Sequence, residues 1–208
     1  MTAPRPTLLY ALAALNLALL AFSRVGAFDG ITWWMEVAPA LIVWPLLLAT
    51  HKQFPLTPLL LGLIFIHACI LILGGHYSYA RVPLGAWIQQ LFDMGRNPYD
   101  GIGHLAQGFI PAIAARELLL RRTALVRGGW LFTLVTATAL AISAIYELIE
   151  WGAAVAIGQG ADEFLGAQGD PWDTQKDMAL AWLGAMLAQV MLSRLHDRQI
   201  DRQVAKAS

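Results

Sequence analysis

Asp100, His104 and Gln107 are spaced four and then three residues apart, which places all three on one face of an α-helix. An aspartate and a histidine one helical turn apart can share a proton, hold one imidazole tautomer or bind a metal ion together. Asp100 also follows the turn-forming segment 97–99, Asn-Pro-Tyr, so it is equally suited to be the N-cap of that helix. The pattern therefore predicts either a polar functional site or a capped helix whose histidine lies in a helix contact.

Glu147 and Glu150 lie three residues apart near the end of a long apolar run, so they also share a helical face. Two neighbouring carboxylates can share one proton, which leaves one of them able to act as an acid, and they can equally bind a divalent cation. The structural alternative pairs both glutamates with basic residues elsewhere in the chain, namely Arg81, Arg96 or Lys176.

Asp173 and Asp177 stand one helical turn apart at the start of the next apolar run. Asp173 suits an N-cap, where the helix dipole stabilises a negative charge. Asp177 lies a full turn inside, where capping no longer explains it. Ala181 and Gly184 continue the same face with small side chains, which let a neighbouring helix approach closely. Asp177 is therefore the better functional candidate of the pair.

These spacings predict one polar site built from three helices. The candidate catalytic residues are His104, Asp100 and Glu150. The candidate ligands of a divalent metal ion are Asp100, His104, Glu147, Glu150 and Asp177. The residues expected to contact a substrate or to support these groups are Gln107, Asp173, Gln175, Trp151, Glu36 and His76. The glycine-containing connection 158–169 is expected either to fold over the site as a lid or to rest on the membrane surface.

The elements that position these residues are expected to be membrane-spanning helices. Hydrophobic residues make up 58% of the chain and charged residues only 13%, whereas a soluble domain usually carries about a quarter charged residues. A span needs about 17–25 mostly apolar residues. Six segments come close: 7–22, 32–50, 57–75, 101–120, 128–157 and 176–195. We expect an all-α bundle of about six transmembrane helices in a single domain, 1–208. The first segment, 7–22, can alternatively be interpreted as a cleaved signal peptide.

The distribution of lysine and arginine orients the bundle through the positive-inside rule. With the N-terminus in the cytoplasm, nine basic residues fall in cytoplasmic segments and three in outer loops: Arg5, Lys52, Arg121, Arg122, Arg127, Arg194, Arg198, Arg202 and Lys206 against Arg24, Arg81 and Arg96. Both termini are therefore expected to be cytoplasmic. The same orientation places the acidic clusters on the extracytoplasmic side.

Several functional classes find no support in the sequence. The net charge is zero, so binding to nucleic acid has no electrostatic basis. The single cysteine, Cys69, cannot form an intramolecular disulfide. The chain contains no nucleophile elbow, phosphate-binding P-loop, dinucleotide-binding fingerprint or HExxH zinc motif.

Several motifs together resemble the YjdF-like bacterial inner-membrane proteins. These motifs lie at 97–104, 107–112, 116–117, 143–151, 164–170 and 172–178. A more distant likeness, carried by Asp100, His104, Glu147, Glu150 and the 177–184 segment, points to the VanZ-like membrane proteins. Gly101 and Ala181 depart from the lysine and the asparagine expected in that pattern. The resemblance implies a multi-pass protein of the bacterial inner membrane, and the VanZ-like pattern implies a role in the cell envelope.

Three functions are compatible with these patterns. The first is a membrane-embedded enzyme that acts on a lipid or envelope-precursor head group at the outer leaflet, either with or without a metal ion. In it, His104 is the acid/base or a metal ligand oriented by Asp100, and Glu147, Glu150 and Asp177 hold a divalent cation or supply the second acid/base. The second is a small proton-coupled transporter, for which His67 is nearly the only polar group near mid-membrane. The third is a structural or partner-binding protein whose acids brace the bundle.

Overall fold

The computed structural model describes residues 6–157 and 168–207, and these residues are helical apart from short connections. The α-helices in this part of the chain are α1 (Thr7–Arg24), α2 (Gly30–Thr50), α3 (Pro58–Tyr77), α4 (Pro83–Leu91), α5 (Tyr99–Arg122), α6 (Gly129–Ile157) and α8 (Asp173–Ala207). A short 3₁₀ turn, η1 (Tyr79–Arg81), connects α3 to α4. The expected all-α fold is confirmed.

Five helices, α1, α2, α3, α6 and α8, are long and apolar enough to cross a membrane. The other expected span is α5, which has 24 residues but carries buried ionisable side chains along its length, including Asp100, His104, Arg116 and Glu117. Its composition alone therefore does not identify it as a span, and a sixth crossing stays a prediction.

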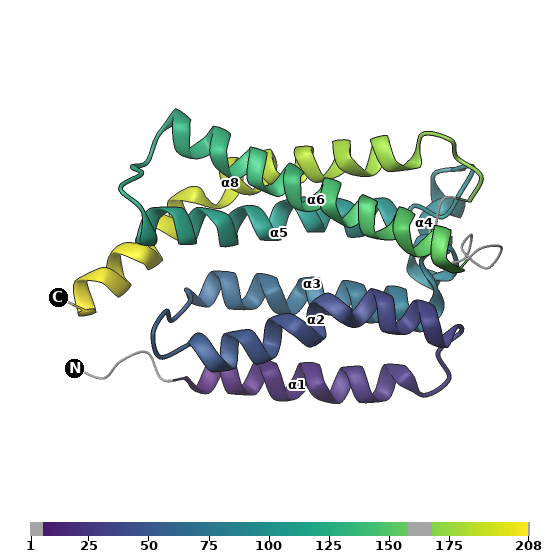
Figure 1. The fold of residues 1–208 in the computed structure, drawn as a ribbon, viewed down its shortest axis with the longest axis horizontal. Helices are drawn as coiled ribbons and strands as arrows, with labels where there is room; N and C mark the ends of the chain where they lie inside the picture. The colour runs from purple at the N-terminus through teal and green to yellow at the C-terminus, as the bar shows by residue number, and fades with distance from the viewer. Residues whose placement is uncertain (1–5, 158–167, 208) are drawn as a thin grey trace.

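The long helices run side by side and form two groups (Figure 1). One group contains α1, α2 and α3, and the other contains α5, α6 and α8. α1 starts and α8 ends at the same end of the bundle, and α4 lies at the opposite end. We call the end that carries α4 the α4 end. Because α5 packs on α3, α6 and α8, it lies at the junction of the two groups.

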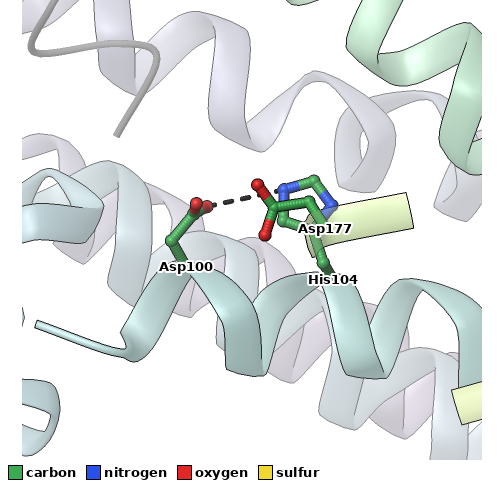
Figure 2. A group of neighbouring side chains, drawn as sticks. All are labelled: Asp100, His104 and Asp177. Carbon is green, nitrogen blue, oxygen red and sulfur yellow. Dashed lines mark ion pairs between the residues drawn. The ribbon is translucent and has the colours of Figure 1, made fainter. Parts of the chain in front are cut away.

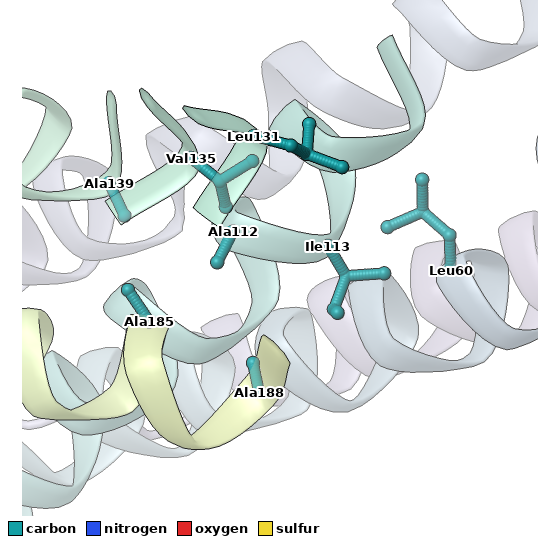
Figure 3. Packing of buried hydrophobic residues seen from close by; sticks show 8 residues of the cluster. All are labelled: Leu60, Ala112, Ile113, Leu131, Val135, Ala139, Ala185 and Ala188. Carbon is teal, nitrogen blue, oxygen red and sulfur yellow. The ribbon is translucent and has the colours of Figure 1, made fainter. Parts of the chain in front are cut away.

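An apolar core fixes the middle of α5 between its neighbours. Ala112 and Ile113 of α5 are fully buried with Val135 of α6 and Ala185 of α8, and Leu60 of α3 completes the contact (Figure 3). Small and β-branched side chains dominate this cluster, so the helix axes can lie close together and van der Waals contact is extensive.

The closest contact in the bundle is that between α5 and α8. A Cβ atom added at Gly108 would lie 1.8 Å from the carbonyl oxygen of Ala181, and one added at Gly184 would lie 2.2 Å from the carbonyl oxygen of Leu105. Neither position has room for a side chain. The expectation that Ala181 and Gly184 allow a close helix approach is confirmed.

α8 is longer than expected, because its charged C-terminal part is tied to the bundle. His196 is fully buried, and its Nε2 lies 3.0 Å from a carboxylate oxygen of Glu117. Gln199 accepts a hydrogen bond from the amide of Leu59, and Gln203 donates one to the carbonyl of Leu56. The helix therefore continues about three turns past the expected end at residue 195.

Arg116 and Glu117 form a buried ion-pair network and do not extend to the membrane surface. Glu117 is fully buried, pairs with Arg121 at 2.6 Å and accepts hydrogen bonds from the amide and hydroxyl of Thr57. Arg116 pairs with Asp197 at 2.8 Å. The sequence is compatible with two arrangements of Arg116 and Glu117, extension of the side chains to the membrane interface or an ion pair, and the structure has the ion pair. We call this group, with His196, the inner cluster.

We predict that Gly184→Ala destabilises the protein by about 1–3 kcal/mol, because the added methyl group collides with the backbone of α5. Thermal unfolding in detergent measures the change. Gly62→Ala in α3 is the matched control, since a Cβ atom there meets nothing within 4 Å. Equal unfolding temperatures for the two variants would contradict the close α5–α8 contact.

Candidate functional site

The start of α5 is fixed by Asn97. Its side-chain amide donates to the carbonyls of Ala80 and Val82, each at 3.1 Å, and its side-chain oxygen accepts from the amide of Tyr99 at 3.0 Å. Gln168 completes the connection with two hydrogen bonds to the Asn97 backbone. These bonds tie the α4 end of α5 to the η1 turn and to the segment before α8.

The expectation that Asp100 caps α5 is wrong. The helix begins at Tyr99 with Pro98 in the N-cap position, and Asn97 satisfies the first free amide. Asp100 therefore lies inside the first turn, and it is only 8% exposed. Its carboxylate is left available for contacts with other side chains.

The structure brings together the five predicted metal ligands from three helices. Asp100 and His104 come from α5, and Asp177 comes from α8 beside them (Figure 2). Glu147 and Glu150 come from α6. Asp100, His104 and Asp177 each offer one ligand atom within 4.8 Å of the others, and His104, Glu147 and Glu150 do the same. We call these five residues the outer cluster.

His104 lies between the acidic side chains. Its Nε2 is 3.5 Å from an oxygen of Asp100, and its Nδ1 is 3.6 Å from an oxygen of Glu147. Both distances exceed an ordinary hydrogen bond. An ion of two positive charges bound among these atoms would have carboxylate and imidazole ligands, a set found in divalent metal sites.

Several atoms of the outer cluster are buried without a hydrogen-bond partner among the described residues. They are Oδ2 of Asp100, Nδ1 of His104, Oε1 of Glu147 and Oδ1 of Asp177. Asp177 is 1% exposed and His104 is 5% exposed. Buried polar atoms are normally paired, because an unpaired one loses its hydration without compensation. A bound ligand or ordered water molecules would satisfy these atoms.

The outer cluster borders a cavity of about 250 Å³, which we call the polar cavity. Asp100, His104 and Glu150 contribute to its wall. The wall also includes Glu36, which is 2% exposed, and Gln107, whose side-chain oxygen has no hydrogen-bond partner in the described part of the chain. Glu36 and Gln107 therefore lie where the sequence places them, beside the catalytic candidates.

Two tyrosines of the cavity wall were not expected from the sequence. The ring of Tyr79 lies against Gly74 and Gly103, where added Cβ atoms would be 2.5 and 3.0 Å from ring carbons. Tyr146 meets the imidazole of His104 edge-on, with ring centroids 6.4 Å apart. The sequence offered one indication for Tyr146, its position next to Glu147. Adjacent residues of an α-helix can both border a wide cavity.

The basic residues near the outer cluster pair with acids at the start of α8 and in the loop before it. Arg96 pairs with Asp173 and, at 3.7 Å, with Asp170. Lys176 pairs with Asp170 at 2.5 Å. The hydrogen bond from Lys176 holds the pKa of Asp170 below its ordinary value, with the amide of Trp172 and the charge of Arg96 acting in the same direction. These pairs brace the loop beside the outer cluster.

The remaining predicted residues lie outside the polar cavity wall. Nδ1 of His76 is 2.8 Å from the carbonyl of Ser23, in the contact between α3 and α1. Gln175 is exposed, and Trp151 is 67% exposed, as suits an interface anchor. Asp173 pairs with Arg96. The expected lid falls mainly on residues 158–167, which are outside the described residues.

Comparison with known proteins places the chain in a family. The model of a family described as "Predicted membrane protein (DUF2238)" matches residues 8–198. The chain is 55% identical over 192 residues to the inner membrane protein YjdF of Escherichia coli (strain K12), and the match covers 91% of each chain. No solved structure matches. The resemblance to YjdF-like proteins is confirmed, while the likeness to VanZ-like proteins stays a resemblance. The chain belongs to the DUF2238 family of membrane proteins and has several helices that can cross the bilayer.

Proposed function

We propose that the protein is a metal-dependent enzyme of the bacterial inner membrane, and that it acts on a lipid or envelope-precursor head group at the outer face. The inner-membrane location follows the printed name of its Escherichia coli relative. The outer-face assignment follows the excess of lysine and arginine at the opposite end of the bundle.

The observation that carries the proposal is the set of buried, unpaired atoms in the outer cluster. Charged groups inside a membrane protein are costly, and they usually serve a function or have a partner. Asp100 and Asp177 have oxygens without a hydrogen-bond partner in the described chain, and Asp100 and His104 border a cavity large enough for several water molecules or part of a head group.

A divalent cation held by the outer cluster would polarise a phosphoryl or carbonyl oxygen of the head group. His104 is placed either to coordinate that cation or to accept a proton from the attacking hydroxyl, and Asp100 orients its imidazole ring. Glu150 borders the same cavity and can return a proton to the leaving group. Hydrolysis or transfer of a head group fits these roles.

We predict that the purified protein binds Mn²⁺ or Zn²⁺, and that His104→Ala and Asp177→Asn each weaken binding more than about tenfold, since each removes a ligand. Elemental analysis and metal titration measure the effect. His76→Ala and Asp173→Asn are matched controls, because they replace the same residue types at the α4 end but outside the outer cluster. Both controls should bind metal as the parent protein does.

Thermal unfolding of the same variants separates a metal site from a brace. Loss of metal from variants that stay folded supports the enzyme. A parent protein without metal affinity, together with unfolding of His104→Ala, would mean that the cluster only braces the bundle.

We predict that the outer cluster faces the extracytoplasmic side, so a cysteine at the α4 end should react with a membrane-impermeant maleimide in intact cells. Trp172→Cys, 63% exposed at that end, is the test position, and Val126→Cys, 75% exposed in the connection between α5 and α6, is the control. Both are placed in a Cys69→Ala background, which removes the only native cysteine. Labelling of Val126→Cys instead of Trp172→Cys would reverse the orientation.

A further inference from the structure

A second cavity runs along the bundle from the polar cavity. It has a volume of about 300 Å³ and is lined by apolar side chains of α2, α3 and α5, with His67 the one ionisable side chain in its wall. We call it the apolar groove. Leu60, Ala68 and Ile110 are buried in its wall, whereas Leu46 of α2 and Leu118 of α5 are each 55% exposed. The exposed leucines place one side of the groove next to surrounding lipid.

The polar cavity and the apolar groove adjoin each other. Both are bordered by Pro39, Val43, His67, Leu71 and Pro111. These five residues come from α2, α3 and α5, so the two spaces meet along a shared wall on three helices.

One face of α5 runs along both spaces and changes from charged to apolar. Its residues are separated alternately by four and three positions, the spacing of a continuous helical stripe, and they are Asp100, His104, Gln107, Pro111, Ala114 and Leu118. α2 repeats the order with Glu36, Pro39, Val43 and Leu47. A ligand that matches this stripe has a polar group at one end and a hydrocarbon chain extending from it.

Both spaces have walls on the side of the bundle. α2 packs on α1 and α3, whereas α6 packs on α5 and α8. The polar cavity is nevertheless bordered by Val43 of α2 and by Ile142 of α6, which is 38% exposed. Because these walls belong to apolar helices of membrane-spanning length, we expect them to face lipid chains and not the aqueous surface.

We infer that the substrate is a membrane phospholipid that enters from the bilayer between the two helix groups, with one acyl chain in the apolar groove and its phosphate at the outer cluster. The inference rests on the proposed function, which supplies the cation that receives the phosphate. Burial of the chain against Val43, Ala114 and Leu118 provides binding free energy that a water-soluble head group lacks.

The test uses the full chain in nanodiscs that contain a phospholipid with a diazirine in the middle of one acyl chain. After irradiation, mass spectrometry of peptides is expected to find adducts on groove residues such as Ala114 and Leu118. Ala114→Trp fills the groove and should reduce those adducts at least about fivefold, by analogy with other steric blocks of apolar pockets. Ala14→Trp on the exposed face of α1 should leave them unchanged.

Val43→Phe narrows the groove from α2 and should repeat the effect of Ala114→Trp, so the result does not depend on the folding of one variant. Metal affinity is measured on the same samples. Unchanged groove adducts in both blocked variants would overturn the inference while normal metal binding leaves the proposed function in place. Blocked adducts in a protein without metal affinity would support the groove and overturn the proposed function. Displacement of the label by a polyisoprenyl phosphate, but not by excess unlabelled phospholipid, would show that the occupant is not a phospholipid.

Discussion

The packing of the whole bundle depends on the burial of one polar helix, α5, inside a membrane protein. An unshielded charge at the bilayer centre costs about 2.5–3.5 kcal/mol or more, and α5 carries buried ionisable side chains near both its ends. It is tolerated because α3, α6 and α8 pack around it. The glycines Gly108 and Gly184 let α8 approach the α5 backbone directly. This close contact also places Asp177 beside His104, so the packing that shields α5 is the packing that assembles the outer cluster.

Helical periodicity predicted most of the outer cluster, because each helix contributes residues spaced by one turn. Asp100 with His104, and Glu147 with Glu150, share a helical face wherever the helices lie. Small residues following Asp177 correctly predicted the close partner helix. Contacts between distant segments left no such local signal. The ring of Tyr79 reaches the cavity because Gly74 leaves room for it. This contact depends on how η1 packs on α3, which the local sequence does not indicate.

Local rules also failed where a neighbour competed for the same role. Asp100 has the sequence context of an N-cap, but Asn97 takes the free amide of Tyr99 and releases the carboxylate. The predicted last span ends at residue 195, at the start of a charged helix end. The helix continues past this residue, and His196 pairs there with Glu117 of α5. In both cases a residue outside the expected pattern, in the preceding connection or on another helix, determines the outcome.

The two clusters on α5 both contain buried acids and a histidine but differ in how their atoms are satisfied. In the inner cluster, Glu117 is bonded to Arg121, His196 and Thr57, so its carboxylate is compensated by cations and donors. Such a network braces helices and needs no ligand. In the outer cluster, carboxylates of Asp100 and Asp177 keep unpaired oxygens within the described chain, and the nearby arginine and lysine pair with loop acids instead. Since both clusters are buried on the same helix, burial alone does not account for the difference. The excess of acids over the single His104 in the outer cluster favours a bound cation there, and the apolar groove beside it favours a substrate that carries a hydrocarbon chain.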